Sequence, residues 1–118
     1  MRRSFKSRRT RTSKYGAIKT EVDGIVFASH AEARRYSELK LLEKAGEITN
    51  LVLQPKFPIV VNGVKICTFI GDFGYWDVAA QKNITEDVKG AHKGSAYAMF
   101  NIKKKLVLAC YGIEILET

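Results

Sequence analysis

The sequence is poor in cysteine, in long apolar runs and, over its first 19 residues, in acidic side chains. Its two cysteines, Cys67 and Cys110, lie far apart and form no CxxC pair, which argues against a disulfide framework and against a zinc site. No apolar run approaches the roughly 18 residues that a membrane-spanning helix needs. Because no apolar segment follows the basic N-terminus, we expect no secretory signal and a reduced, cytoplasmic protein.

The positive charge is confined to one end of the chain. Residues 1–19 contain eight Lys or Arg and no acid, whereas the other 99 residues contain 12 basic and 12 acidic side chains. A tail of this kind suits the phosphates of nucleic acid, although RNA, anionic lipid, an acidic protein or a purely solubilising role are alternatives. We predict that residues 1–14 form a disordered basic tail. Its candidate nucleic-acid contacts are Arg8, Arg9, Arg11 and Lys14.

The length of 118 residues and the apolar content of 46% fit one globular domain with a modest core. Local signals predict a helix over 30–45, capped by Ser29 and ended by Gly46, and a second helix over 96–111, ended by Gly112. Between them we expect extended chain over 51–61, a turn at Asn62-Gly63, a strand over 64–76, a turn over 81–83 and a strand over 84–89. Short strands over 25–27 and 113–116 complete the pattern. This order predicts an α/β domain with a small mixed sheet flanked by helices.

Two neighbouring strands carry the residues of most chemical interest. Asp72 lies in an apolar run, where an unpaired charge would cost several kcal/mol. Asp87-Val88-Lys89 is a D-x-K tripeptide whose two charged side chains share one face of a strand. If the strands pair through the predicted turn, two carboxylates and one ammonium meet on one face. Asp77 would replace Asp72 in this arrangement if the register differed.

Two carboxylates suit a hard cation such as Mg²⁺ or Mn²⁺, and the carbonyl of Val88 is a third candidate ligand. The cation would lower the pKa of a water that attacks a phosphodiester. Lys89 would orient or deprotonate that water, or neutralise charge on the phosphorus. The alternative is an ordinary ion pair between strands, because Asp-x-Lys occurs often by chance.

The arrangement resembles the PD-(D/E)XK nuclease superfamily. The core of that superfamily is a helix with an acid, a strand with an Asp, a strand with D/E-x-K and a following helix. The corresponding residues here are Glu32, Asp72, Asp87-Val88-Lys89 and the 96–111 helix. The resemblance therefore implies a restriction-endonuclease-like core over 15–118, with Glu32 as a further catalytic and metal-binding acid. Gly71 departs from the pattern, because it stands where the motif has Pro.

The sequence also resembles a family of small phage-encoded proteins of this superfamily. The matching segments are 14–17, 22–24, 29–36, 53–55 and 86–90. Members of the superfamily include restriction enzymes and the resolvases that cut Holliday junctions in DNA recombination, and most use Mg²⁺. The resemblance implies a Mg²⁺- or Mn²⁺-dependent DNA endonuclease that acts on branched or duplex DNA as a homodimer. The alternatives are a nucleic-acid-binding protein without catalysis and an adaptor that docks on another protein.

Several residues carry a competing structural interpretation. Ser29 and Glu32 match a capping box, which would explain Glu32 without catalysis. Lys93 and Lys103 are candidate phosphate contacts or simply solvated lysines. Gln54 would contact substrate or satisfy a backbone group, and Glu86 is expected to be a surface charge. The residues expected in the core are Phe100, Val107 and Leu108, whereas Tyr75 and Trp76 are expected in the core or at an interface rather than as platforms for stacking bases.

Overall fold

Hairpins and helices alternate along the chain in the computed structural model, which describes residues 18–88 and 94–118. The chain divides into two compact units, Met1–Ser37 and Glu38–Thr118. The elements are, in order, β2 (Thr20–Val22), β3 (Ile25–Phe27), α1 (His30–Lys44), β4 (Ile48–Leu53), β5 (Lys56–Val61), β6 (Val64–Ile70), β7 (Phe73–Asp77), β8 (Lys82–Asp87), α2 (Ser95–Tyr111) and β9 (Ile115–Glu117).

The N-terminal unit contains a short antiparallel hairpin, β2–β3, and the start of α1. The hairpin turns at Asp23 and Gly24, whose φ angles of 54° and 76° lie in the left-handed region that such tight turns require. Ser29 caps α1 as predicted, since its Oγ accepts a hydrogen bond from the backbone N–H of Glu32 at 3.2 Å. The rings of Phe27 and Tyr36 pack with centroids 5.0 Å apart.

Both helices begin and end close to the predicted positions. The chain leaves α1 through Gly46, with a φ of 81°, and leaves α2 through Gly112, with a φ of 69°. The Gly112 N–H donates to the carbonyl of Leu108, which closes the last turn of α2. The helix ends were therefore predictable because their signals lie within a few residues of each end.

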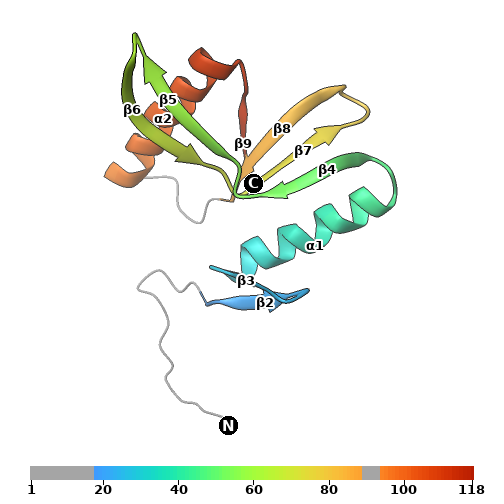
Figure 1. The fold of residues 1–118 in the computed structure, drawn as a ribbon. Helices are drawn as coiled ribbons and strands as arrows, with labels where there is room; N and C mark the ends of the chain where they lie inside the picture. The colour runs from blue at the N-terminus through green and yellow to red at the C-terminus, as the bar shows by residue number, and fades with distance from the viewer. Residues whose placement is uncertain (1–17, 89–93) are drawn as a thin grey trace. The chain divides into compact units, whose positions relative to one another are not determined.

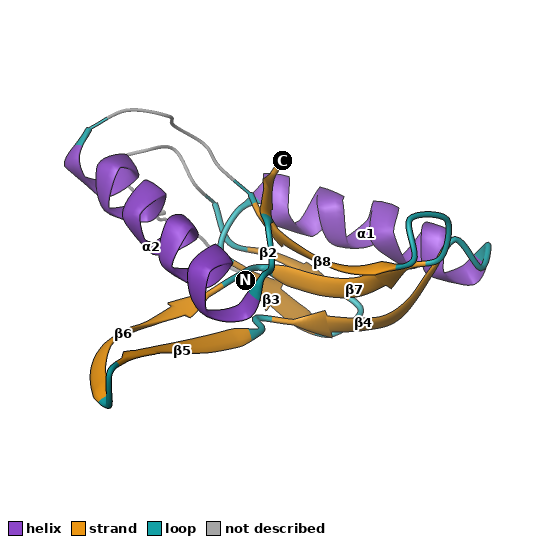
Figure 2. Cartoon of the chain, turned by 90° about the horizontal axis from the view of Figure 1, so that it is seen from above, coloured by secondary structure: helices purple, strands orange, loops and turns teal. Residues whose placement is uncertain are grey.

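The C-terminal unit is built on a mixed four-stranded sheet in the order β4-β7-β8-β9 (Figure 1). β7 pairs antiparallel with both β4 and β8, whereas β9 runs parallel to β8. A separate antiparallel hairpin, β5–β6, packs against α2 (Figure 2). Their shared core consists of Ile59, Phe69, Phe100, Val107 and Ile115. The predicted α/β class with a mixed sheet is confirmed.

The prediction of one strand over 64–76 was wrong. β6 ends at Ile70 and pairs with β5, whereas β7 begins at Phe73 and belongs to the four-stranded sheet. Gly71 and Asp72 carry the chain from one sheet to the other. The expected extended segment over 51–61 divides in the same way, because β4 and β5 are separated at Gln54, which has a φ of 52°.

Smaller differences follow from long-range packing. The β7–β8 turn spans 78–81 rather than 81–83, so β8 covers Lys82–Asp87. Leu108 was expected in the core but is 47% exposed. Phe100, Val107 and Tyr75 are buried as predicted. The 1–14 tail lies outside the described residues, and none of the described helices is long and apolar enough to cross a membrane.

Candidate functional site

Asp72 is anchored at the end of the β7–β8 ladder by both its backbone and its side chain. Its backbone N–H donates to the carbonyl of Glu86 at 2.9 Å. Its Oδ2 accepts the backbone N–H of Val88 at 2.6 Å. The carboxylate thus takes the place of a backbone carbonyl as acceptor where the regular strand pairing stops.

This anchoring brings Asp72 next to Asp87, as the sequence predicted. The Val88 nitrogen is two covalent bonds from the Asp87 Cα, so Asp72 Oδ2 lies no more than about 5.5 Å from that Cα. The pairing of Phe73 with Glu86 immediately precedes this point in the ladder. The two acids therefore sit together because the ladder and the carboxylate–amide hydrogen bond fix the same register.

The crossing segment leaves little room for any side chain at position 71. The Gly71 N–H donates to the carbonyl of Pro55, and the Gln54 N–H donates to the carbonyl of Asp72, both at 3.0 Å. A Cβ built on Gly71 would lie 2.7 Å from the methyl carbon of Thr85, which is too close for real atoms. The glycine before Asp72 thus allows the chain to pass tightly over β8. Gln54 contributes to this site at least through its backbone.

Asp87 is held from the other side by the C-terminal strand. Its carbonyl accepts the N–H of Thr118 at 3.0 Å, and its side chain is buried, with 8% exposure. It lines a hollow of about 340 Å³ together with Lys103 of α2. Lys103, a predicted phosphate contact, therefore lines the same hollow as Asp87, one of the two predicted acids.

A third acid near Asp87 was not predicted from the sequence. Glu117 of β9 is the parallel-strand partner of Asp87, and paired residues on neighbouring strands lie about 4.8 Å apart. Its carboxylate accepts the Tyr97 hydroxyl at 2.9 Å and pairs with Lys104 Nζ at 2.8 Å. The hydrogen bond to Glu117 raises the pKa of Tyr97. No local pattern could have revealed this pair, because it depends on β9 returning beside β8.

Glu86 was expected to be a surface charge, and this was wrong. Its side chain is fully buried and accepts a 2.5 Å hydrogen bond from the Tyr75 hydroxyl. The alternation along β8 was right, since Glu86 and Asp87 point to opposite faces. The face of β8 that carries Glu86, however, is buried rather than exposed to solvent.

The other predicted site residues differ in what the structure describes of them. Glu32 lies in the N-terminal unit, a different unit from that of Asp72 and Asp87, so its role in the site stays a prediction. Asp77 accepts the N–H of Ala80 at 3.0 Å in the β7–β8 turn, at the far end of the hairpin from Asp87. The predicted residues that lie outside the described part of the chain are Lys89, Lys93, Arg8, Arg9, Arg11 and Lys14.

The donors at this site are all oxygen atoms, which suits a hard divalent cation. They are the carboxylates of Asp72 and Asp87, with the peptide carbonyl of Val88 as the predicted third donor. No group of three or more His, Cys, Asp or Glu side chains arranged to hold a metal occurs within residues 18–88 and 94–118. The fit therefore rests on two carboxylates and a carbonyl, a set compatible with Mg²⁺, which usually keeps several waters.

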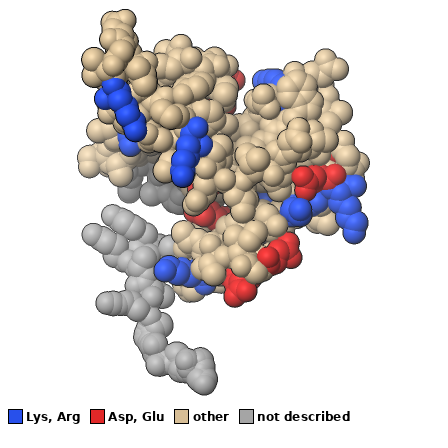
Figure 3. Space-filling view, viewed as in Figure 1, with Lys and Arg blue, Asp and Glu red and all other residues tan. Residues whose placement is uncertain are grey.

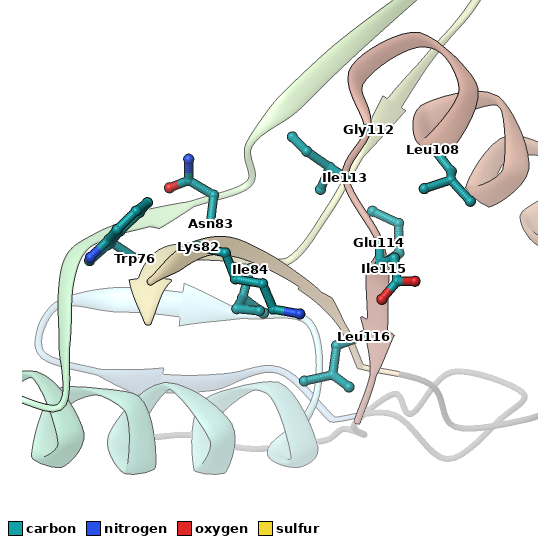
Figure 4. Close-up of a pocket in the computed structure, with 10 residues that line it drawn as sticks. All are labelled: Trp76, Lys82, Asn83, Ile84, Leu108, Gly112, Ile113, Glu114, Ile115 and Leu116. Atoms are coloured by element: carbon teal, nitrogen blue, oxygen red, sulfur yellow. The ribbon is translucent and has the colours of Figure 1, made fainter. Parts of the chain in front are cut away.

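A larger pocket of about 660 Å³ lies elsewhere in the C-terminal unit (Figure 4). Its walls come from β7, β8, the end of α2, β9 and the segment that joins α2 to β9. Its single acid is Glu114, and it includes neither Asp72 nor Asp87. The smaller hollow also has a single acid, but that acid is the buried Asp87, whose peptide with Val88 lies against the Asp72 carboxylate, so the smaller hollow is the better candidate for chemistry.

The cations of the described surface do not form one broad basic patch on the face shown in Figure 3. Lys and Arg side chains appear there as separate small groups among uncharged residues. The excess positive charge of the chain is instead concentrated in residues 1–19, which contain eight Lys or Arg and no acid. Long-range attraction to a polyanion would therefore come mainly from that segment.

The comparisons with known proteins give a family and no activity. A family model described as "Protein of unknown function (DUF1064)" matches residues 12–114, which includes every acid of the candidate site except Glu117. No curated protein and no solved structure matches the chain.

Proposed function

The chain belongs to the DUF1064 family, whose description names no function, and we propose that it is a divalent-metal-dependent DNA endonuclease that hydrolyses phosphodiester bonds. The observation that carries the proposal is the 2.6 Å hydrogen bond from the Val88 N–H to Asp72 Oδ2. It holds the Asp72 carboxylate of the D…D-x-K pattern directly against the Asp87–Val88 peptide. A chance Asp-x-Lys tripeptide would have no reason to meet a second acid in this way.

Asp72, Asp87 and the Val88 carbonyl would hold the cation. When bound, the cation would supply charge neutralisation and water activation for attack on phosphorus. The protein's own contribution is to hold the two acids in place. The Asp72 carboxylate accepts the Val88 N–H, and the backbone carbonyl of Asp87 accepts the Thr118 N–H. This rigidity matters because a cleavage site must be organised before its substrate arrives.

Cationic residues would place the substrate. Lys103 lines the same hollow as Asp87 and would contact a phosphate of the bound strand. Lys89 keeps its predicted role at the reacting phosphate, and the basic residues of the tail would provide affinity that falls with salt. Glu32 is proposed as an additional acid of the site.

We extend the proposal to a homodimer that acts on branched DNA such as a Holliday junction. Each chain offers one pair of acids, Asp72 and Asp87, and cutting two strands requires two sites. A two-fold dimer presents two equivalent sites with the symmetry that such a junction also has.

Cleavage assays with the full chain test the proposal directly. Labelled junctions, flaps, duplexes and single strands would be incubated with Mg²⁺, with Mn²⁺ and with EDTA. We expect metal-dependent cleavage that Asp87→Asn and Lys89→Ala abolish. Glu114→Gln is the matched control, because Glu114 is an exposed acid that lines a different pocket. Failure of the wild-type chain to cut any of these substrates with either metal would overturn the proposal.

Non-catalytic binding of nucleic acid is the second candidate, and the charge of residues 1–19 is the observation that favours it. This function needs the tail but not the acids. It predicts salt-sensitive binding that is independent of metal and unchanged in Asp87→Asn. The two candidates therefore separate in the same set of assays.

A further inference from the structure

About half of the accessible lining of the hollow beside Asp87 is apolar, which is more carbon than a site that binds only phosphate needs. Its volume of about 340 Å³ lies at the lower end of the range for small-molecule pockets. Asp87 and Lys103 are its charged residues, and the remaining lining is Thr68, Phe69, Ile70, Ala96, Met99 and Phe100. Ile70 and Met99 are about half exposed, so their side chains are accessible to a ligand.

A phosphate group gains little from this lining. Phosphates are held in proteins by Arg or Lys side chains, hydroxyls and backbone N–H groups. Lys103 supplies one cation and Thr68 one hydroxyl, whereas Ile70 and Met99 present exposed aliphatic carbon above the buried rings of Phe69 and Phe100. Flat, weakly polar groups gain from such walls, because they remove apolar surface from water on both partners.

We propose that this hollow receives one unpaired nucleobase of the DNA strand whose phosphate lies at Asp87. The inference rests on the proposed endonuclease function and adds a specificity element to it. A base is joined to its phosphate through a single sugar, so a phosphate at Asp87 and Lys103 brings a base within reach of Ile70 and Met99. The ligand is therefore a nucleotide within a strand, with the base between β6 and α2.

Base occupancy would give selectivity for unpaired DNA. A base stacked in a duplex must first be extruded, which costs free energy, whereas a base at a flap, a branch point or in a single strand is already accessible. Each methylene group that the base shields from water changes affinity about fourfold, so truncation of one aliphatic wall side chain should change affinity by about tenfold. The hollow would thus favour cleavage next to unpaired nucleotides.

Two matched pairs of variants address the walls of the hollow. Met99→Ala removes a wall residue that is 52% exposed, and Ile102→Ala is its control on the same helix, at 54% exposure and outside the hollow. Ala96→Phe fills the hollow, and Ala98→Phe adds the same ring at an exposed helix position that does not line it. The altered side chains are partly or largely exposed, so the variants should fold.

The cleavage experiment moves a single abasic site along the substrate strand. We expect wild-type cleavage to fall about tenfold when the missing base is the one adjoining the cleaved phosphate. Met99→Ala and Ala96→Phe should cut the intact substrate about tenfold more slowly and lose this sensitivity, whereas Ile102→Ala and Ala98→Phe should behave as wild type. Equal effects of the test and control variants, or cleavage indifferent to every abasic position, would overturn the inference.

A binding experiment separates this inference from the endonuclease proposal. A single-stranded oligonucleotide containing 2-aminopurine would be titrated with the full chain in EDTA, with an otherwise identical abasic oligonucleotide and with free dTMP as competitor. Tighter binding of the base-containing strand, lost in Ala96→Phe, supports the base site even if no substrate is cut. Equal affinity for both strands, or dTMP competing as well as the strand itself, would overturn it even if cleavage occurs.

Discussion

The Asp72 carboxylate accepts the backbone N–H of Val88 at 2.6 Å. Through this contact one side chain completes the end of the β7–β8 ladder and also becomes the neighbour of Asp87. A structural role and a candidate chemical role therefore meet in the same residue. Substitutions at position 72 can separate the two, because stability needs only an acceptor whereas the proposed chemistry needs a charge.

Asp72→Ala should lower the free energy of unfolding by about 1–3 kcal/mol, since it leaves the partly buried Val88 N–H without this acceptor. Asp72→Asn retains an oxygen acceptor and should lose much less stability while losing DNA cleavage. Urea titrations and cleavage assays on the same preparations measure both effects. Asp77→Ala, which removes an exposed turn acceptor, is the stability control. Wild-type cleavage by Asp72→Asn would contradict this assignment.

Tyr75→Phe should lower the free energy of unfolding by about 1.5–3 kcal/mol, because the lost hydroxyl donates to the fully buried Glu86 carboxylate. Tyr111→Phe is the matched control, as it removes an exposed hydroxyl that donates to the Pro58 carbonyl at 2.6 Å. We expect a loss of about 1 kcal/mol or less for the control. If both variants lose the same free energy of unfolding in thermal or urea experiments, the burial of Glu86 does not strengthen its hydrogen bond with Tyr75 relative to an exposed one.

Lys103→Ala should weaken DNA binding and slow cleavage several-fold, because Lys103 shares a hollow with Asp87. Lys105→Ala removes an equal charge from the same helix, at an exposed position that does not line that hollow. Steady-state cleavage rates and binding titrations at fixed salt compare the two variants. If both lysines matter equally, the effect is one of general charge rather than of the site.

Replacing Arg8, Arg9, Arg11 and Lys14 with Gln should reduce DNA affinity most strongly at low salt. If all four contact phosphates, the slope of log affinity against log salt should become shallower by about 3 to 4 on duplex DNA. Fluorescence anisotropy over a range of salt concentrations measures that slope. An unchanged slope would assign the phosphate contacts to other residues.

Glu43 should make stability depend on pH in the acidic range. Its hydrogen bond with Lys40, followed by that with the Leu51 N–H, lowers its pKa below the ordinary value of 4.5. The ionised form is thus favoured by folding, so this stabilisation is present above pH 4.5 and is lost as pH falls through the lower folded pKa. Glu43→Gln should be less stable than wild type at pH 7, and the two melting temperatures should converge as the pH is lowered below 4.5. A difference in melting temperature between the two proteins that stays constant as the pH falls would exclude this linkage.

Local signals were sufficient for the elements that depend on neighbouring residues. Ser29 and Gly46 bound α1, Gly112 ends α2, and Asn62-Gly63 turns the β5–β6 hairpin. Each of these signals is a capping or turn preference that acts over a few residues. The proximity of Asp72 to Asp87 was also predictable, because a short hairpin connects their strands.

Features of the site that depend on residues far apart in the chain were decided by the tertiary structure. The break at Gly71 exists because the chain crosses between sheets over Thr85 and Pro55, and no local pattern records that crossing. The burial of Glu86, the pairing of Glu117 with Asp87 and the position of Lys103 beside Asp87 depend on how β9 and α2 return to the sheet. The sequence alone determined which residues could do chemistry here. Long-range packing determined which of them lie together, because strand pairing and burial depend on residues far apart in the chain.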